Sequence, residues 1–161
     1  MRDSRHTGAL MIALAAAVLA AGCSHAASTD ASDGNSTTTP STIRIATPAG
    51  EFVVQGDILK KYNSLGGTTS PPGLPITDEQ AGPNGGRYSR FEGGAIYWTA
   101  QTGAHIVWGA IRAAFEHENG GAGGPLGYPT TDEYTVPGGW QSQFQHGTIT
   151  YTDGQPHVQV G

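Results

Sequence analysis

Apolar positions in residues 56–67 recur with the period of an α-helix. The apolar side chains fall on one helical face and the polar ones on the other: Ile58, Leu59, Tyr62 and Leu65 against Lys60, Lys61, Asn63 and Ser64. Asp57 is suited to cap the start of this helix, and Gly66 or Gly67 to end it. Residues 110–118 show a related pattern, so we expect two short amphipathic helices.

Alternating side chains predict strands over residues 87–91, 95–99 and 105–108, with short glycine-containing segments between them that suit hairpin loops. Because successive side chains of a strand point to opposite faces, the alternation also predicts which face is buried. We expect these side chains to face the core: Ile96, Trp98, Ile106, Trp108, Ile149, Tyr151, Val158 and Val160. Tyr97, His105 and His157 are then expected to point outward.

The same succession of residues occurs twice, at an interval of about 53 positions. Residues 72–79 match 126–133, and residues 91–98 match 144–151. The sequence therefore predicts an α+β fold of two tandem repeats, about 56–108 and 109–161, each a short helix, a Gly/Pro turn and an antiparallel β-meander. Residues 52–55 match the strand that closes each repeat, and we expect them to pair in the sheet of the first repeat.

The N-terminal segment has the pattern of an export signal. Arg2 and Arg5 precede an apolar run over residues 9–21, which is too short to span a bilayer comfortably. The small residue Gly22 before Cys23 resembles a bacterial lipobox, which implies a signal peptide over 1–22 and lipidation of Cys23. A plain secretory signal is the alternative. Residues 23–50 are expected to be a disordered, Ser/Thr-rich tether, glycosylated or unmodified, ahead of a folded domain over 51–161.

Composition argues against several function classes. Eight Lys and Arg residues against 13 Asp and Glu give a net charge of −5, which disfavours nucleic-acid binding. A single cysteine cannot form an intrachain disulfide or a cysteine-rich metal site. No serine lies in a Gly-x-Ser-x-Gly motif, and His117-Glu118 lacks the second histidine of a zinc protease helix. We therefore expect no cofactor, no metal and no enzymatic activity.

A set of motifs occurs in the same order in both copies: Gly-Gly, then Leu126-Gly127-Tyr128-Pro129, Thr-Asp-Glu, and a strand such as Ile96-Tyr97-Trp98. This succession resembles the LGFP repeat family of actinobacterial cell-envelope proteins. The resemblance implies propeller-like repeats that bind or anchor to cell-wall polysaccharide, either arabinogalactan or peptidoglycan, and support envelope integrity. Together with the lipobox at Cys23, it leads us to expect the chain on the outer face of the cytoplasmic membrane, held there by the lipid anchor alone. Two repeats would pack face to face or self-associate to complete a ring.

Candidate glycan-binding residues are those whose chemistry suits sugar hydroxyls and sugar rings. Tyrosine and tryptophan rings stack on sugars, carboxylates accept hydrogen bonds from hydroxyls, and a histidine occupies the same position in both copies. The candidates are Tyr88, Tyr97, His105, His157, Trp140, Asp78, Glu79, Asp132 and Glu133. The carboxylates could instead stabilise turns or pair with Arg87 and Arg90, and the histidines could bond a neighbouring loop. A small glycan-processing enzyme and a protein interaction module are the alternative functions.

Overall fold

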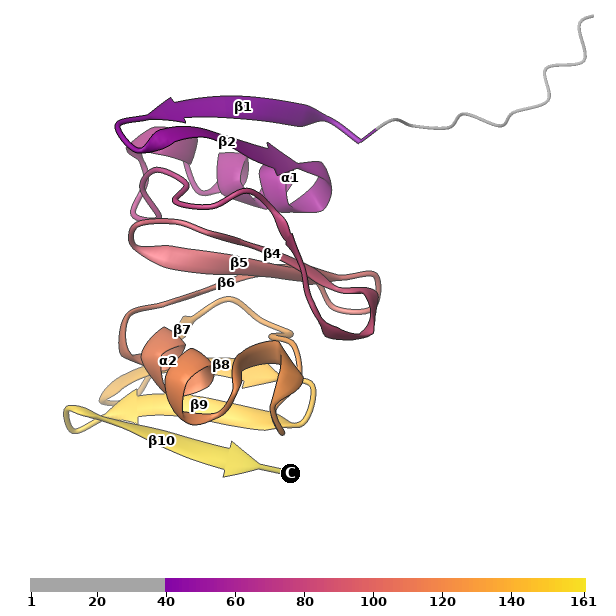
Figure 1. The fold of residues 1–161 in the computed structure, drawn as a ribbon. Helices are drawn as coiled ribbons and strands as arrows, with labels where there is room; N and C mark the ends of the chain where they lie inside the picture. Colours follow the sequence, from indigo (N-terminus) through magenta and orange to yellow (C-terminus); the bar gives the residue numbers. More distant parts are fainter. Residues whose placement is uncertain (1–39) are drawn as a thin grey trace, which may run out of the picture. The chain divides into compact units, whose positions relative to one another are not determined.

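The structure, a computed structural model, describes residues 40–161 (Figure 1). The predicted signal peptide, Cys23 and residues 23–39 of the predicted tether lie outside the described residues. Within residues 40–161, no helix has the length and hydropathy needed to cross a membrane.

Helical segments alternate with antiparallel sheets along the described chain (Figure 1). The first layer is the hairpin of β1 (Thr42–Thr47) and β2 (Gly50–Gln55), followed by helix α1 (Gly56–Ser64). The middle sheet has the order β3-β4-β5-β6 and is followed by α2 (Gly109–Ala113), which continues as a π-helical turn over Ala114–Glu118. Its strands are β3 (Gln80–Ala81), β4 (Arg87–Arg90), β5 (Gly94–Thr99) and β6 (Gly103–Trp108).

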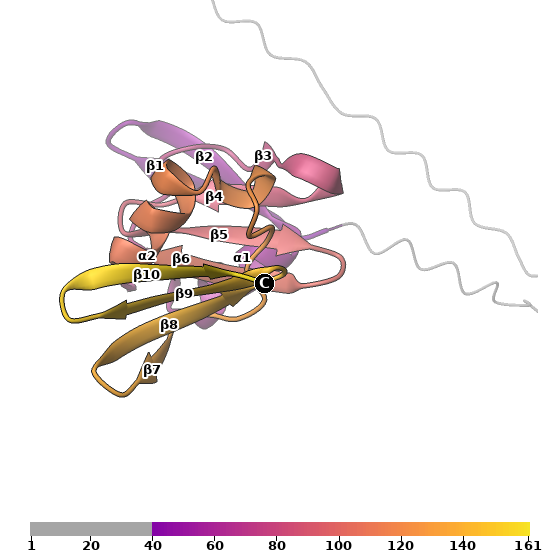
Figure 2. The same ribbon diagram turned by 90° about the horizontal axis from the view of Figure 1, so that it is seen from below.

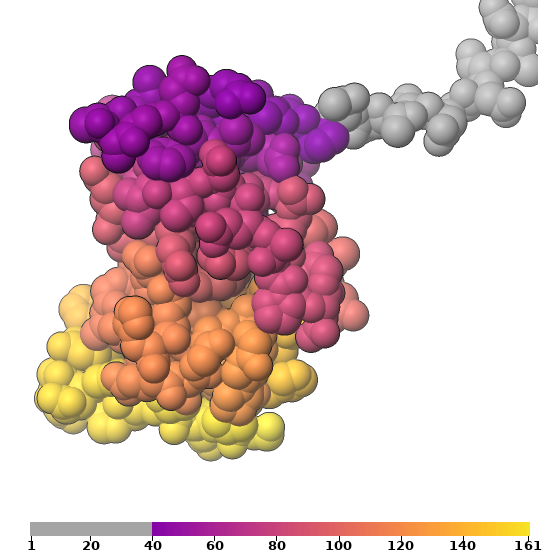
Figure 3. Space-filling model, viewed as in Figure 1, coloured from indigo at the N-terminus to yellow at the C-terminus, as the bar shows by residue number. Residues whose placement is uncertain are grey.

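The last sheet has the order β10-β9-β8-β7, and Figure 2 shows these strands side by side. They are β7 (Tyr134–Val136), β8 (Gly139–Phe144), β9 (Gly147–Thr152) and β10 (Gln155–Val160). Figure 3 shows the same succession at the surface, from the N-terminal hairpin to the C-terminal strands. Helices and antiparallel sheets are thus mixed as predicted, but residues 40–161 show neither clear tandem helix-plus-meander repeats nor a propeller.

Helix α1 forms where the apolar period predicts it. Ile58, Leu59 and Tyr62 are buried, and Gly66 adopts a left-handed conformation (φ 107°) directly after the last turn. The predicted capping role of Asp57 is wrong, because the cap position is Gln55 and its side chain makes no capping hydrogen bond. Asp57 instead lies in the first turn, where a carboxylate interacts favourably with the helix dipole, and pairs with Lys60 at 2.9 Å.

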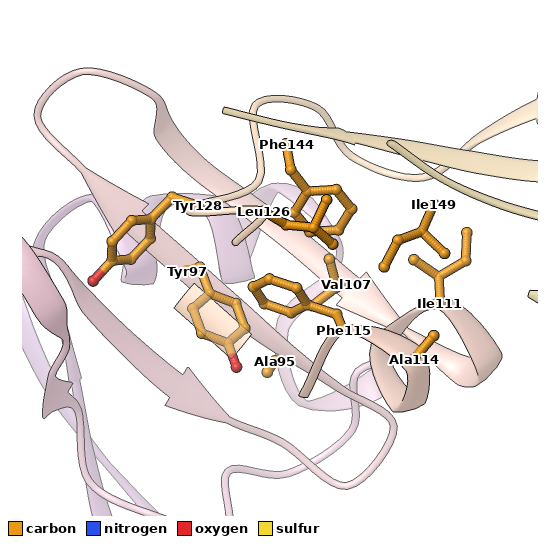
Figure 4. Close-up of a cluster of buried hydrophobic side chains, with 10 residues drawn as sticks. All are labelled: Ala95, Tyr97, Val107, Ile111, Ala114, Phe115, Leu126, Tyr128, Phe144 and Ile149. Atoms are coloured by element: carbon orange, nitrogen blue, oxygen red, sulfur yellow. The ribbon is translucent and has the colours of Figure 1, made fainter. Parts of the chain in front are cut away.

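Both faces of the middle sheet are buried. One face, with Ile96 and Ile106, packs in the cluster that contains α1, and the other, with Tyr97 and Val107, packs against α2 and its π-helical turn (Figure 4). The prediction that Tyr97 points outward is therefore wrong, since only 3% of its surface is exposed. Sequence alternation marked a single core face, whereas the next helical segment along the chain covers the second face.

The Leu126-Gly127-Tyr128-Pro129 step and its counterpart Pro72-Gly73-Leu74-Pro75 are tight structural turns. Leu126 is fully buried, and Gly127 has a φ of 69°, which side chains resist. A Cβ at Gly127 would lie 2.7 Å from Oε1 of Gln145, the atom that accepts a 2.8 Å hydrogen bond from the Tyr128 backbone N–H. The same relation holds for Gly73, where the close atom is Oε2 of Glu92. The motif therefore builds the fold in both halves.

The N-terminal hairpin corrects two predictions. Strand β2 pairs with β1 and not with the middle sheet, so the expected pairing of residues 52–55 in the sheet of the first repeat is wrong. Strand β1 itself occupies residues that the sequence placed in the disordered tether. The segment contains few apolar residues, so its sequence does not predict a strand. In β1 only Ile45 is buried, and it packs with Val54 of β2 in the cluster that contains α1.

Strand β10 is an edge strand of the last sheet and has no strand on its outer side among residues 40–161. The prediction that Val158 and Val160 lie in the core is wrong, because they are 37% and 52% exposed. Their counterpart Ile106 is buried because it packs in the cluster that contains α1, whereas Val158 and Val160 belong to no such cluster among residues 40–161. The self-association expected from the resemblance stays a prediction.

Candidate functional site

An open cavity of about 290 Å³ lies where α2 begins and the last sheet approaches it. Trp108 ends β6, and Ile111 lies one turn into α2. Trp140 on β8 and Tyr151 on β9 are directly paired across the strands, and their rings stack with centroids 6.2 Å apart. We call this cavity, lined also by Gly109, Ala110 and Glu133, the aromatic pocket.

The aromatic pocket presents two kinds of chemistry. Trp140 is 48% exposed, so its ring is open to a ligand, while Tyr151 supports it from within the sheet. Burial raises the pKa of Glu133, and the hydrogen bond from the Trp108 side chain partly offsets that rise. Aromatic faces beside a carboxylate that can accept hydrogen bonds are what a sugar ring with several hydroxyls requires.

The corresponding place in the first half of the domain holds a smaller cavity of about 150 Å³. Trp98 on β5 stands where Tyr151 stands on β9, and Arg87 is paired with Trp98 as Trp140 is with Tyr151. Arg87 forms an ion pair with Glu79, whose side chain is only 4% exposed. We call this cavity the first-unit pocket. At the position where the aromatic pocket has the exposed ring of Trp140, the first-unit pocket has Arg87, which pairs with the buried side chain of Glu79.

Two predicted carboxylates hold neighbouring layers together. Asp78 accepts a 2.7 Å hydrogen bond from the backbone N–H of Val53, and the Glu79 N–H donates to the Val53 carbonyl at 3.1 Å. Asp132 accepts a 3.1 Å hydrogen bond from the Ile106 N–H. Each bond satisfies a backbone donor on the outer edge of a strand, which would otherwise lack a partner in its own sheet. The alternative prediction, that the carboxylates stabilise turns or pair with Arg87 and Arg90, describes only Glu79, which pairs with Arg87, whereas the two aspartates bind distant strand edges.

Asp132 also joins two elements that are far apart in the sequence. Lys61 on α1 forms an ion pair with it, and the His105 ring lies 3.5 Å from its Oδ1 atom. Burial opposes ionisation of Asp132, but the hydrogen bonds from His105, Lys61 and the Ile106 backbone outweigh it and lower its pKa to about 2. His105 is further held by the Thr102 carbonyl at 2.8 Å and is 20% exposed. It is therefore a packed residue that contacts a neighbouring loop.

The structure separates the predicted site residues into groups. Trp140 and Glu133 line the aromatic pocket, Glu79 lines the first-unit pocket, and His157 is exposed on β10, away from both sets of lining residues. Tyr88 and Tyr97 stack at 5.4 Å in a third cavity. The sequence missed Trp108 and Tyr151 as site residues because alternation assigned them to the core. Their position beside Trp140 depends on strand register, which the repeat alignment could have supplied.

No metal site accompanies these cavities in the part of the chain that the structure describes, where no group of three or more His, Cys, Asp and Glu side chains could hold an ion.

Comparison with models of known protein families gives a match. A family model described as LGFP repeat matches residues 73–123 and 126–161, which together make up more than half of the chain. The first matched segment runs from the turn at Gly73 through the middle sheet to the loop after α2, and the second contains the whole last sheet. No curated protein matches the chain significantly.

Proposed function

Because this chain belongs to the LGFP repeat family, we propose that it is a cell-envelope protein that binds cell-wall glycan through the aromatic pocket. The family match supports the coarser part of this statement, a repeat protein associated with the cell envelope. The observation that carries the finer part is the exposed ring of Trp140, stacked on Tyr151 beside the carboxylate of Glu133.

Several features of the aromatic pocket support a neutral sugar as its ligand. An exposed tryptophan loses apolar contact with water when a sugar ring stacks on it, and it loses little conformational freedom because two side-chain torsions fix it. Glu133 supplies acceptor oxygens for hydroxyl groups. The cavity is smaller than pockets for drug-sized ligands, so one or two sugar rings fit its scale.

The two pockets are not equivalent as ligand sites. In the first-unit pocket, Arg87 pairs with Oε1 of Glu79, and the buried Oε2 atom has no hydrogen-bond partner among residues 40–161. The position that would offer a stacking surface for a sugar ring is therefore held by a cation. In the aromatic pocket the position that corresponds to Arg87 is Trp140. The carboxylate of Glu133 accepts a hydrogen bond from the Trp108 side chain and has no cation in the place of Arg87. We therefore assign glycan binding to the second half of the domain.

Retention of the full chain on purified arabinogalactan and on peptidoglycan tests this assignment. Trp140→Ala should abolish most retention on the glycan that binds, because stacking on an aromatic ring contributes about 1 kcal/mol or more. Ile76→Ala is the matched control, since Ile76 is a comparably exposed apolar residue (45%) outside the pocket. Equal retention of both variants would contradict the assignment.

The further parts of the functional hypothesis concern location and mode of action. We propose that lipidation of Cys23 tethers the protein to the outer face of the cytoplasmic membrane, so that residues 40–161 face the cell wall.

We also propose that the protein acts by binding and not by catalysis. A paired set of carboxylates poised across the aromatic pocket would favour a glycosidase, but the cavity is lined by one carboxylate, Glu133, among the described residues.

A further inference from the structure

The third cavity, of about 230 Å³, lies between the middle sheet and the loop that follows α2. Its lining includes Tyr88 and Arg90 of β4, Glu116 of the π-helical turn, and the glycines of the turn Gly121–Gly123. We call it the arginine pocket. It shares no lining residue with the aromatic pocket.

The charges in and around the arginine pocket do not cancel. Glu116 is 6% exposed and accepts hydrogen bonds from the Tyr97 hydroxyl at 2.7 Å and from Nε of Arg112 at 3.1 Å. Arg90 approaches the same carboxylate only to 3.6 Å, which is beyond hydrogen-bonding distance. Two guanidinium groups thus share one carboxylate, in a chain whose net charge is −5.

Arg90 has donor groups to spare. Its Nε atom is buried and has no hydrogen-bond partner among residues 40–161, while its guanidinium carbon lies 5.2 Å from the centre of the Tyr88 ring. A buried donor without a partner is costly, and guanidinium groups recognise carboxylates through a planar fork of N–H donors. The Tyr88 ring attracts the positive charge of Arg90 through its face and uses none of its N–H groups.

The remaining lining favours an acidic ligand that also carries hydroxyl groups. A Cβ at Gly121 would meet nothing within 4 Å, so the glycine turn leaves space that side chains would otherwise occupy. Glu116 keeps acceptor capacity on its Oε2 atom, which faces Arg90 at 3.6 Å. A doubly charged phosphate would be repelled by Glu116, whereas a single carboxylate with neighbouring hydroxyls can pair with Arg90 and donate to Glu116.

We propose that the arginine pocket binds an acidic sugar, with the ligand carboxylate on Arg90 and a ligand hydroxyl on Glu116. The last sheet carries glutamine at the position of Arg90, namely Gln143 on β8, and therefore lacks the guanidinium group at that position. The site therefore belongs to the junction between the two halves of the domain. It is independent of neutral glycan binding in the aromatic pocket.

Calorimetric titration of the full chain carrying Trp140→Ala, which removes the stacking ring of the aromatic pocket, tests this proposal with glucuronate, with glucose as the neutral sugar of the same ring, and with inorganic phosphate. Glucuronate should bind, and glucose and phosphate should bind at least about tenfold more weakly. Arg90→Gln, which introduces the residue found at the corresponding position of β8, should weaken glucuronate binding by about tenfold or more. Arg90→Lys retains the positive charge but lacks the planar fork of N–H donors, so its glucuronate affinity should lie between those of the wild type and Arg90→Gln. This variant preserves the test if Arg90→Gln fails to fold.

The controls separate the arginine pocket from general charge effects and from the aromatic pocket. Arg44→Gln removes one charge from an exposed strand residue and should leave glucuronate binding unchanged. Trp140→Ala should also leave it unchanged, even if that variant loses polysaccharide. Equal affinity for glucose and glucuronate, tighter binding of phosphate, no binding of glucuronate, or unchanged glucuronate affinity in folded Arg90→Gln would each overturn the proposal.

Discussion

The carboxylate of Asp78 accepts a hydrogen bond from the backbone N–H of Val53 at 2.7 Å, and Asp132 accepts one from Ile106 at 3.1 Å. In both cases an aspartate in a Thr-Asp-Glu segment binds the exposed edge of the strand that precedes a helix. The side chain thereby completes the backbone hydrogen bonding of a strand that belongs to another sheet. This relation explains why Asp78 and Asp132 are part of the fold, since their carboxylate oxygens are already bound to backbone N–H groups.

Replacing Asp132 by alanine should lower the free energy of unfolding by about 1–3 kcal/mol. The variant leaves the Ile106 N–H without its acceptor and Lys61 without its ion-pair partner. Asp132→Asn should cost less, because the amide oxygen can still accept the Ile106 hydrogen bond. Urea unfolding measures both, with Glu118→Ala as an exposed acidic control. An Asp132→Ala variant as stable as the control would contradict this role.

The hydrogen bonds to Asp132 make the free energy of unfolding depend on pH. The pKa of Asp132 is lowered from 3.8 to about 2, so the folded state favours the ionised form. The stabilisation is complete above pH 3.8 and is lost as the pH falls towards 2. The stability difference between the wild type and Asp132→Asn should therefore be constant near neutral pH and should shrink on acidification through this range. A difference that grows on acidification would reverse the sign assigned here.

The N-terminal hairpin should be required for stability. A chain beginning at Gly56 lacks β1 and β2, so the apolar surface that Ile45 and Val54 cover beside α1 becomes exposed. Burying two such side chains is worth about 3–6 kcal/mol in total. We expect a lower melting temperature or aggregation compared with a chain beginning at Pro40. Equal melting temperatures and solubility would show that the hairpin does not contribute to the fold.

The sequence predicted the parts of this fold that depend on local periodicity. Ile58 and Tyr62 mark α1, and the strand alternation locates β4, β5 and β6 within one or two residues. It failed where a neighbouring layer decides the outcome. Tyr97 is buried because α2 covers a face that alternation assigns to solvent, and Val158 is exposed because no segment covers β10 in the described chain.

The candidate site shows the same division between local and long-range information. Trp140 and Glu133 were identified from residue chemistry, but their association with Trp108 and Tyr151 requires the pairing of β8 with β9 and the approach of α2. Asp78 was predicted as a sugar-binding residue from its carboxylate chemistry. Its Oδ1 atom instead accepts a hydrogen bond from the backbone N–H of Val53. A single sequence does not distinguish a carboxylate that waits for a ligand from one that binds a distant backbone.

Glu133→Gln should stabilise the protein more as the pH rises. Burial raises the pKa of Glu133 above its ordinary value of 4.5, so the folded state favours the protonated acid and ionisation destabilises it. The stability contribution of the protonated acid is therefore complete below pH 4.5 and is lost as the pH rises through the folded-state pKa. Melting temperatures should diverge in favour of the glutamine variant between acidic and neutral pH. A difference that is independent of pH would show that Glu133 ionises freely.

Acylation of Cys23 is the prediction that concerns the N-terminal segment. Metabolic labelling with a clickable fatty acid should mark the wild type, because Cys23 follows a small residue at the end of an apolar run. Cys23→Ala should lose the label and appear in the medium. Label retained on this variant would rule out acylation at this residue as the anchor.

The indole N–H resonances of the three tryptophans test glycan binding by the aromatic pocket most directly. Trp108 and Trp140 line the aromatic pocket, while Trp98 lines the first-unit pocket and serves as an internal control. On titration of isotopically labelled protein with soluble fragments of arabinogalactan or peptidoglycan, the resonances of Trp140 and Trp108 should shift in a saturable manner, and that of Trp98 should stay in place. A glycan that binds without moving the Trp140 resonance, or that moves only Trp98, would contradict the account.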